Sequence, residues 1–498
     1  MTEARVEQLL EVQVAAHPDA LALEDATGAA WSWADLDAAA RALAAEISDQ
    51  GVRPGDRVLI LIENCAAAVA ALFACWQVGA VPVPVNARQS GPEIDRIAAH
   101  ACPRLLLFTA GVSPDAARHA ARCGASTIEG TWGRLDMTRA PGDGTASGGD
   151  VAVVLYTTGT TGAPKGVMLT HANLRFGAAT SATFRAMTAR DLIYGVLPIT
   201  HVFGLCSILV ASVHVGCAVR LIPRFNVGAV FEGLRQGITL FSGVPQMHAL
   251  LMAHAEAQGL ERLGSQTLRF VSSGAAPLDP AWKRKAEAFY GVALQNGYGM
   301  TESTAGIAAT HSALGDPDSS VGPPLPGIEV RIDEAVPGGG DGAGEVLTRG
   351  GHVMQGYFRD PDATAQVLNA EGWLRTGDLG RIDGEGRLHI VGRCKELIIH
   401  GGFNVYPPEV EAVLSDFPGV VQAAVVGRRR VGDEEVLAFV QTAPGAGVDE
   451  AGLRAFVGKR LAGYKRPSVY VFAESLPAAP TGKILKHRLI ETFSARLG

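Results

Sequence analysis

The sequence has 498 residues, more than one hydrophobic core usually organises, so we expect two or more domains. Hydrophobic residues make up 47% and charged residues 19% of the chain, which is typical of ordinary soluble globular proteins. The formal net charge of -7 disfavours a general binder of nucleic acid or of anionic membranes, because both need a basic surface; a small-molecule partner fits better. The 7 cysteines include no CxxC pair and are odd in number, which suggests reduced thiols, a cytoplasmic location and no metal cage.

The first part of the chain alternates short β-rich runs with alanine-rich helical segments. Its N-terminus carries acidic residues and lacks an apolar core long enough for a secretory signal, so we expect a soluble helix there. Residues 66–85 resemble a membrane span, but Gln77, Gly79 and Pro82 interrupt them, which favours a buried helix followed by a strand. Parallel sheets covered by helices are predicted by the strand-like runs 57–63, 80–85 and 104–110 and by the helical segments 66–79 and 91–101.

Glycine-rich stretches and a change in the pattern of predicted strands and helices divide the rest of the chain. Residues 140–150 are expected to form a surface loop and residues 337–345 a hairpin turn. From about residue 393, strand and helix patterns alternate on a smaller scale, which predicts a second domain of about one hundred residues. The expected fold class is α/β.

A loop rich in glycine and threonine follows the apolar run 151–156. Its sequence, YTTGTTGAPKG at 156–166, offers backbone amides, hydroxyl donors and one lysine charge, which together suit a polyphosphate. The loop lacks the GxxxxGK[ST] spacing of a Walker A motif, which disfavours a P-loop kinase or GTPase. Taken alone, it is also compatible with a solvated surface loop.

The longer stretch YTTGTTGAPKGVMLTH resembles the phosphate loop of the adenylate-forming superfamily, which includes acyl-CoA synthetases, 4-coumarate:CoA ligases, luciferases and peptide-synthetase adenylation domains. Further stretches follow in the order of that family: LPITHVFGL (197–205), SSGAAPL with NGYGMTE (272–302), GWLRTGDLG (372–380), GRCKELIIHGGFNVYPPEVE (392–411) and PAAPTGKILKHRL (477–489). Such an ordered series is not expected by chance.

The resemblance implies a fold and an activity. The fold is a large N-terminal domain, residues 1–394, of parallel and mixed sheets flanked by helices with a β-barrel-like subdomain, and a small mobile α+β C-terminal domain, residues 395–498. The activity is that of an ATP-dependent acid–CoA ligase with ATP, Mg²⁺ and coenzyme A as cofactors. A thiol does not attack a free carboxylate, because oxide is a poor leaving group, whereas AMP leaves readily from an acyl adenylate. Mg²⁺ is expected to bridge the phosphates.

The resemblance also assigns the nucleotide site. Thr301 is expected to contact the α-phosphate, and Glu302 and Thr161 to hold Mg²⁺. Asp378 and Arg393 are assigned to the ribose, and Lys483 to the charge that develops as pyrophosphate leaves. The other residues expected around the nucleotide are Thr157, Thr158, Gly159, Thr160, Gly162, Lys165, Gly274, Ala275, Ala276, Asn296, Gly297, Tyr298 and Gly299. From the residues alone, Glu302 is also compatible with an acid at a helix N-terminus, Asp378 with a turn residue and Lys483 with a solvated charge.

Coenzyme A and the hinge are assigned in the same way. Lys395 is expected to be the hinge, and Gly401 and Gly402 to let the pantetheine arm approach the backbone, although two glycines also suit a plain β-turn. Arg88, Tyr464 and Arg466 are expected to meet the adenosine phosphates of CoA. The arginine run 428–430 is compatible with that role or with a solvated turn, and Val431 stands where aryl-CoA ligases can carry a tryptophan that stacks on adenine.

The acyl pocket is expected from His201, Phe203, Gly204, Val244, Gln246, Ser273, Gly274 and Gly299, with Ala275 and Ala276 beside them. His201 is assigned to substrate orientation, although a core histidine is the alternative. These segments are mostly small or apolar and carry no obvious Arg or Lys, so the acid is expected to have an apolar, uncharged tail. Arylalkenoic, benzoic and medium-chain aliphatic acids all remain open.

Three other functions stay open at this point. A stand-alone adenylation enzyme would load an acyl carrier protein, a luciferase-like oxygenase would share the first step, and a nucleotide sensor would lack catalysis. Neither a nucleic-acid partner nor a membrane span is expected. A homodimer is one assembly that the sequence leaves open.

Overall fold

This computed structural model describes residues 4–142, 150–158, 164–274, 280–304, 306–337, 339–401, 403–430, 433–442, 447–478 and 484–497. The chain divides into two compact units. The first contains Met1–Glu329 and Thr348–Leu374, and the second contains Val330–Leu347 and Arg375–Gly498. Residues 375–394, which we expected in the large domain, thus group with the second unit, and a functional boundary at residue 394 stays a prediction.

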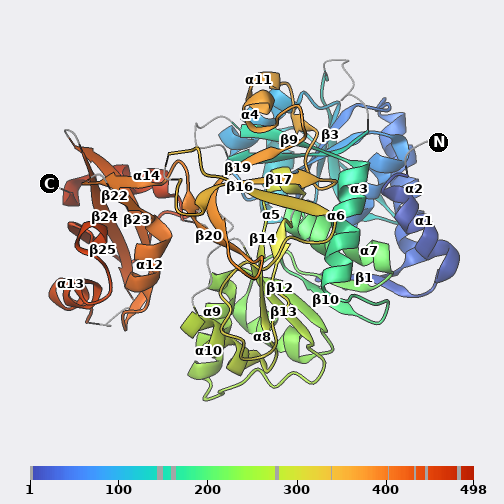
Figure 1. Ribbon diagram of the computed structural model, residues 1–498. Helices are drawn as coiled ribbons and strands as arrows, with labels where there is room; N and C mark the ends of the chain where they lie inside the picture. The colour runs from blue at the N-terminus through green and yellow to red at the C-terminus, as the bar shows by residue number, and fades with distance from the viewer. Residues whose placement is uncertain are drawn as a thin grey trace. The chain divides into compact units, whose positions relative to one another are not determined.

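Two large sheets form the frame of the first unit (Figure 1). The eight-stranded sheet has the order β15 (Ala308–Ala309), β14 (Leu294–Tyr298), β13 (Phe270–Gly274), β12 (Leu240–Gly243), β10 (Leu192–Gly195), β11 (Ala218–Leu221), β1 (Leu21–Asp25) and β2 (Ala30–Ser32). The five-stranded sheet has the order β4 (Val81–Asn86), β3 (Arg57–Ile62), β5 (Leu105–Phe108), β7 (Gly133–Arg139) and β6 (Ser126–Gly130). The strands β10 to β14 pair in parallel, as do β3, β4 and β5, which confirms the predicted parallel sheets.

Helices separate and cover these sheets. The main core joins both sheets through α1 (Glu7–Ala16), α2 (Trp33–Asp49), α3 (Ala66–Val78), α6 (His171–Phe184), the π-helix η1 (Phe203–Val210) and α7 (Ala211–Val215). A second core places α4 (Gly91–Ala101) and α5 (Pro114–Arg122) on the opposite face of the five-stranded sheet. A third packs α8 (Val227–Arg235), α9 (Pro245–Ala257) and α10 (Pro280–Tyr290) on β10, β12, β13 and β14 (Figure 1).

The helix α3 explains the apolar stretch that resembles a membrane span. Each residue from Ala66 to Trp76 is buried, as expected for a helix that is apolar on all sides and lies between protein layers. Gly79 ends it in the left-handed conformation, with φ 77°, and β4 follows. Among the residues that the structure describes, no helix combines the length and apolarity needed to cross a membrane.

Smaller sheets complete the two units. The first unit has a three-stranded sheet of β18 (Gly356–Tyr357), β9 (Pro164–Thr170) and β8 (Val151–Thr158), followed by α11 (Pro361–Val367). A four-stranded sheet has the order β16 (Ile328–Asp333), β17 (Ala343–Gly350), β19 (Leu374–Ile382) and β20 (Leu388–Arg393). The hairpin turn predicted at residues 337–345 overlaps the connection between β16 and β17, which are neighbours in this sheet; Gly338 lies outside the described residues, and residues 343–345 already belong to β17.

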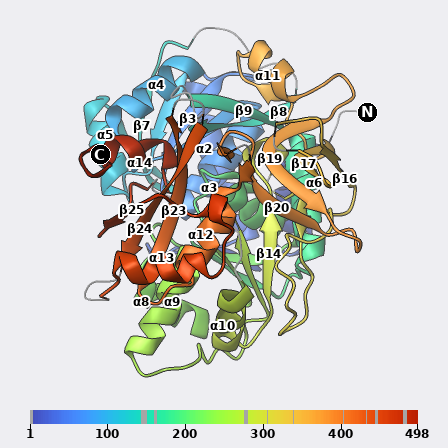
Figure 2. The ribbon, with the colours of Figure 1, turned by 60° about the vertical axis from the view of Figure 1, so that its left-hand side comes forward.

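The C-terminal part of the second unit is an α+β layer structure (Figure 2). Its three-stranded sheet has the order β23 (Val420–Arg430), β24 (Asp433–Thr442) and β25 (Val469–Ala473), and β21 (Ile398–His400) and β22 (Phe403–Val405) form a hairpin. One face of the larger sheet packs on α12 (Pro407–Ser415) and α13 (Glu450–Gly458), and the other on α14 (Lys486–Thr492).

Candidate functional site

The predicted phosphate loop connects two antiparallel strands. β8 and β9 pair up to their ends, where Thr157 lies opposite Lys165 and Thr158 opposite Pro164. Gly159, Thr160, Thr161 and Gly162 lie outside the described residues, as does the side chain of Thr158. Directly opposed residues present their side chains on the same face of a sheet, so the side chains of Thr157 and Lys165 share one face of this hairpin.

A carboxylate meets the base of this hairpin. Thr301 and Glu302 lie on a 3-10 helix, η2 (Thr301–Ser303), and are 8% and 9% exposed. The Tyr357 hydroxyl donates to Glu302 Oε1 over 2.9 Å, and Lys165 Nζ lies 4.6 Å from the centroid of the Tyr357 ring. Burial, and next the Glu302 charge, raises the pKa of Tyr357 well above its usual value, so the phenol is a neutral donor at physiological pH.

The carboxyl ends of three parallel strands form one row of small and polar residues. Gly243 on β12 is in register with Ser273 on β13, which is in register with Asn296 on β14. Ser273 Oγ and Asn296 Oδ1 are buried and have no hydrogen-bond partner within the described part of the chain. Unpaired buried polar atoms at this edge of a parallel sheet fit a ligand that brings its own donors and acceptors.

Two glycines at this edge differ in the space beside them. A Cβ on Gly274 would lie 3.3 Å from Phe203, and on Gly297 the nearest such contact would be the Ala308 carbonyl at 4.0 Å. Tyr298, the last residue of β14, is half-buried and Gly299 is exposed. Ala275 and Ala276 lie outside the described residues.

His201 is exposed and precedes the π-helix η1, so the alternative of a core histidine is wrong. Its Nδ1 accepts a hydrogen bond from the Phe203 backbone N–H at 3.2 Å. Gly204 packs so closely that a Cβ there would lie 2.2 Å from the Pro198 carbonyl oxygen. Val244, the N-cap residue of α9, is half-buried and Gln246 is exposed.

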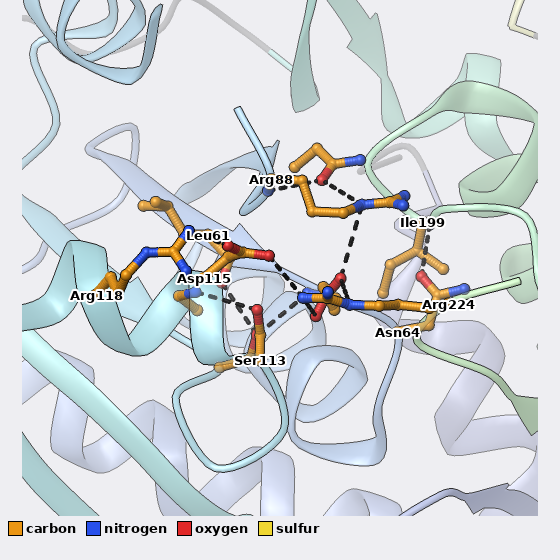
Figure 3. A network of polar contacts seen from close by, with 12 residues as sticks. Leu61, Asn64, Arg88, Ser113, Asp115, Arg118, Ile199 and Arg224 are labelled. Carbon is orange, nitrogen blue, oxygen red and sulfur yellow. Dashed lines mark hydrogen bonds and ion pairs between the residues drawn. The ribbon is translucent and has the colours of Figure 1, made fainter. Parts of the chain in front are cut away.

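A buried glutamate organises the polar network in which Arg88 lies (Figure 3). The Glu63 side chain is 2% exposed, and Arg224 Nε donates to its Oε1 over 2.7 Å. Arg88 Nε lies 3.7 Å from the same oxygen, and Arg224 Nη2 also donates to Asp115 over 2.6 Å. Next to Glu63, the Asn64 amide binds the backbone of Gly195, Leu197 and Ile199, the segment that precedes His201. A role of Arg88 in CoA binding stays a prediction.

In the second unit, the two predicted ribose ligands lie together. Asp378 on β19 and Arg393 on β20 are partners in the antiparallel register, and Arg393 Nε lies 2.9 Å from Asp378 Oδ1. The Asp378 side chain is 5% exposed and that of Arg393 is 44% exposed. The carboxylate is thus oriented by an arginine on the neighbouring strand, which removes the alternative of a plain turn residue.

The predicted CoA and hinge residues lie on separate features of the second unit. Lys395 lies in a turn after β20, and Gly401, with φ 59°, begins the tight connection between β21 and β22. The Tyr464 ring stacks on Phe403 with centroids 4.7 Å apart. Arg466 donates to the backbone carbonyls of Leu461 and Gly458, which is a structural use of its guanidinium group. Gly402 and Lys483 lie outside the described residues.

The arginine run 428–430 lies on β23 and not in a turn. Arg428 Nη2 and Arg430 Nη2 lie 2.7 Å and 2.9 Å from Glu435 Oε2 on β24. Sequence reasoning also missed Lys486, which pairs with Glu396 at 2.9 Å and with Glu411 at 2.8 Å. The only available signal was its place in PTGKILK.

The residues fit ATP and Mg²⁺. Glu302 supplies one buried carboxylate, and Mg²⁺ at nucleotide sites is held by one or two carboxylates together with substrate phosphates. Lys165 would supply a cation for phosphate, and Ser273 and Asn296 have buried polar atoms without a partner among the described residues. A hairpin that leads into the loop expected to bind phosphate, a buried carboxylate and a sheet edge with unpaired polar atoms fit a nucleotide-dependent enzyme.

Comparison with known proteins gives the family. A profile described as AMP-binding enzyme matches residues 10–358, and one described as AMP-binding enzyme C-terminal domain matches residues 409–483. Feruloyl-CoA synthase of Amycolatopsis sp is 36% identical over 94% of each chain, and 4-coumarate–CoA ligase 2 of Oryza sativa subsp. japonica is 33% identical over 96% of this chain and 90% of the relative. A solved structure of O-succinylbenzoate coenzyme A synthetase from Bacillus subtilis, in complex with ATP and magnesium ion, aligns with a TM-score of 0.82 at 29% identity over 97% of this chain and 98% of the other. The chain belongs to the AMP-binding enzyme family.

Proposed function

We propose that the chain activates an apolar, aromatic carboxylic acid with ATP and transfers the acyl group to coenzyme A. The chain is an acid–thiol ligase that works through an acyl adenylate, and ATP, Mg²⁺ and coenzyme A are its cofactors. We further propose that the acid is aromatic, and we assign residues to nucleotide and metal binding.

The main support for this proposal is that Lys165 and Glu302 both contact Tyr357. The first half-reaction brings a carboxylate to a polyphosphate, so positioned cations must offset the repulsion of two anions. Lys165 supplies one such charge beside the loop, and Glu302 would hold Mg²⁺, which neutralises phosphate charge. Asp378 would accept from the ribose hydroxyls, oriented by Arg393.

An aromatic acid is supported by the residues at the sheet edge and by the relatives. Phe203 and Val244 are half-buried apolar side chains near this edge, and a second carboxylate on the substrate would need a cation there. Relatives named for feruloyl and 4-coumarate, which are arylalkenoic acids, match along almost the whole chain at 36% and 33% identity, and one named for long-chain fatty acids matches at 32%. We therefore place arylalkenoic acids ahead of benzoic and medium-chain aliphatic acids.

Acid-dependent exchange of pyrophosphate into ATP tests the first half-reaction. The panel contains ferulate, 4-coumarate, benzoate and straight-chain acids from butyrate to palmitate, followed by thioester assays with free CoA and with a pantetheinylated carrier protein. We expect the highest kcat/KM for an arylalkenoic acid and thioester formation with CoA. Preference for an aliphatic acid would contradict the proposed substrate, and thioester formation only on the carrier would contradict the proposed acceptor.

Lys483 completes the proposed machinery from the sequence alone, because its position lies outside the described residues. Lys483→Ala should abolish exchange while thioester formation from supplied acyl adenylate continues, since the cation acts as pyrophosphate leaves. The exposed Lys459→Ala is the matched control and should leave both steps unchanged. Equal loss of both steps in Lys483→Ala would refute this role.

A cytoplasmic location and a homodimeric assembly stay predictions from the sequence. Gel filtration with light scattering measures the assembly directly.

A further inference from the structure

Tyr357 lies where three chain segments meet in the first unit. β18 pairs antiparallel with β9, with Tyr357 opposite Val167 and Gly356 opposite Met168. The backbone on both sides is fixed as well, because Phe358 N–H donates to the Gly166 carbonyl over 2.7 Å and Met354 N–H to the Glu302 carbonyl over 2.9 Å. The segment is therefore bound both to the strand that leaves the phosphate loop and to the 3-10 helix that carries Glu302.

The side chain of Tyr357 touches two opposite charges in two different ways. Its hydroxyl donates to Glu302 Oε1 over 2.9 Å, which leaves Oε2 for another ligand. Its ring lies under the Lys165 ammonium group, 4.6 Å from Nζ to the centroid, within the range of a cation–π interaction. Tyr357 is 7% exposed and Glu302 is 9% exposed, so their hydrogen bond is shielded from water, and a shielded hydrogen bond is stronger than one at the surface.

The side chains of Glu302 and Lys165 are both intrinsically flexible. Glu and Lys side chains have several rotatable bonds and lose much freedom when they are fixed in one geometry. Glu302 lies in a three-residue 3-10 helix, and Lys165 is the second residue of β9, at the end next to the loop. A rigid aromatic ring held by two backbone hydrogen bonds to its neighbours supplies the missing restraint.

We infer that Tyr357 is a positioning residue that sets the geometry of Glu302 through its hydroxyl and of Lys165 through its ring. The inference rests on the proposed function, in which these two residues serve Mg²⁺ and phosphate. It predicts that the two contacts can be separated by substitution. Tyr357→Phe removes only the hydroxyl, and Tyr357→Leu removes the ring as well.

The test is isothermal titration of ATP at a series of Mg²⁺ concentrations. No acid is present, so there is no turnover. Tyr357→Phe should raise the Mg²⁺ concentration for half-maximal ATP affinity about tenfold, as for other partners that orient a metal ligand, and should leave the affinity at saturating Mg²⁺ near that of the wild type. Tyr357→Leu should weaken ATP binding at saturating Mg²⁺ too, because Lys165 loses its support.

Tyr290→Phe is the matched control. Tyr290 is 5% exposed and its hydroxyl is 2.7 Å from His248 Nδ1, so the substitution also removes one buried phenolic hydrogen bond, but outside the site. Its Mg²⁺ requirement should equal that of the wild type, and thermal unfolding should show that all four proteins are folded. An unchanged Mg²⁺ requirement in Tyr357→Phe, or an equal shift in Tyr290→Phe, overturns the inference about Tyr357 but leaves the proposed function standing. A wild-type protein that binds ATP without any dependence on Mg²⁺ overturns the proposed function as well.

Discussion

At the scale of single residues, strand register decides which predicted partners meet. Asp378 and Arg393 are separated by a turn and by two strands, and the antiparallel register of β19 and β20 brings them opposite each other. The sequence motif named both residues, but only the strand register explains why a carboxylate that is 5% exposed has a cation beside it: the guanidinium group of Arg393 lies 2.9 Å away.

Asp378→Asn tests the ribose assignment. The substitution keeps the size of the side chain and removes its charge, so a charge-assisted hydrogen bond to the ribose becomes a neutral one. We expect KM for ATP to rise about tenfold, which matches a loss of about 1.5 kcal/mol, with KM for the acid unchanged.

The control for Asp378→Asn lies on the same hairpin. Asp383 is also paired with an arginine, Arg387, at 2.9 Å, but belongs to the turn between β19 and β20. Asp383→Asn should leave KM for ATP unchanged. If both variants raise KM for ATP equally, the effect of Asp378→Asn comes from a disturbed hairpin and not from a lost contact with the nucleotide.

Tyr357 shows what residue-level reading of the sequence cannot supply. It is 55 positions from Glu302 and follows no motif that separates it from other buried tyrosines. A buried tyrosine needs a partner for its hydroxyl, but the sequence does not say which one, because the contact depends on how β18 docks on β9. Motifs identified Glu302 and Lys165, and only the tertiary structure joins them.

At the scale of elements, local patterns predicted well the few strands and helices that were assigned residue ranges from the sequence. The helix over 91–101 and the strands over 57–63 and 80–85 appear as α4, β3 and β4 with nearly the expected bounds, because each has a consistent hydrophobic period. The π-helix η1 was not predicted. Its sequence, FGLCSILV, reads as an ordinary apolar run and carries no signal for the i→i+5 hydrogen bonds that define a π-helix.

Gly204→Ala tests how tightly that π-helix is packed. The added Cβ would lie 2.2 Å from the Pro198 carbonyl oxygen, which is backbone and cannot rotate away. We expect the free energy of unfolding, measured by urea titration, to fall by about 1–3 kcal/mol or more.

Gly384→Ala serves as the comparison for that measurement. A Cβ at Gly384 meets nothing within 4 Å, and the residue is exposed between β19 and β20. Its effect should stay within about 0.5 kcal/mol, which is usual for surface substitutions. A similarly small effect at Gly204 would mean that the segment 197–205 yields easily.

At the scale of the whole molecule, a buried histidine couples the fold to pH. His171 is 1% exposed, its Nδ1 accepts from the Val6 N–H over 3.0 Å, and its Nε2 is buried without a partner among the described residues. Burial, followed by the charges of Arg5 and Arg175, lowers the pKa of His171 to about 3, although a Glu7 oxygen lies 3.7 Å from Nδ1. Protonation of His171 would add an N–H at Nδ1, which would then face the Val6 N–H, itself a donor.

The stability of the protein should therefore fall below pH 6.5. The unfolded chain binds a proton at an ordinary histidine pKa of about 6.5, and the folded chain does not until about pH 3, so acidification favours unfolding across this window. His171 alone contributes about 1.4 kcal/mol per pH unit there. His171→Asn, whose amide oxygen can accept from Val6, should lose that slope in urea titrations, whereas His17→Asn at an exposed site should keep it. Parallel slopes for all three proteins would exclude His171 as the coupled group.

The predicted hinge is tested by a backbone restraint. Lys395 lies in the turn after β20, and proline there fixes φ near −65° and restricts the preceding residue. If Lys395 absorbs a rotation between the two half-reactions, Lys395→Pro should keep pyrophosphate exchange and block thioester formation from supplied acyl adenylate. Lys395→Ala should keep both. Normal thioester formation in the proline variant would move the hinge elsewhere.

The Asn64 amide has a consequence for how the protein is made. It is 3% exposed, and its hydrogen bonds go to residues 131 to 135 positions further along the chain. In a nascent chain that ends before residue 195, this amide lacks its three backbone partners and stays hydrated. Burial of Asn64 becomes favourable only after the segment 195–199 has been synthesised, because a buried amide without partners is costly.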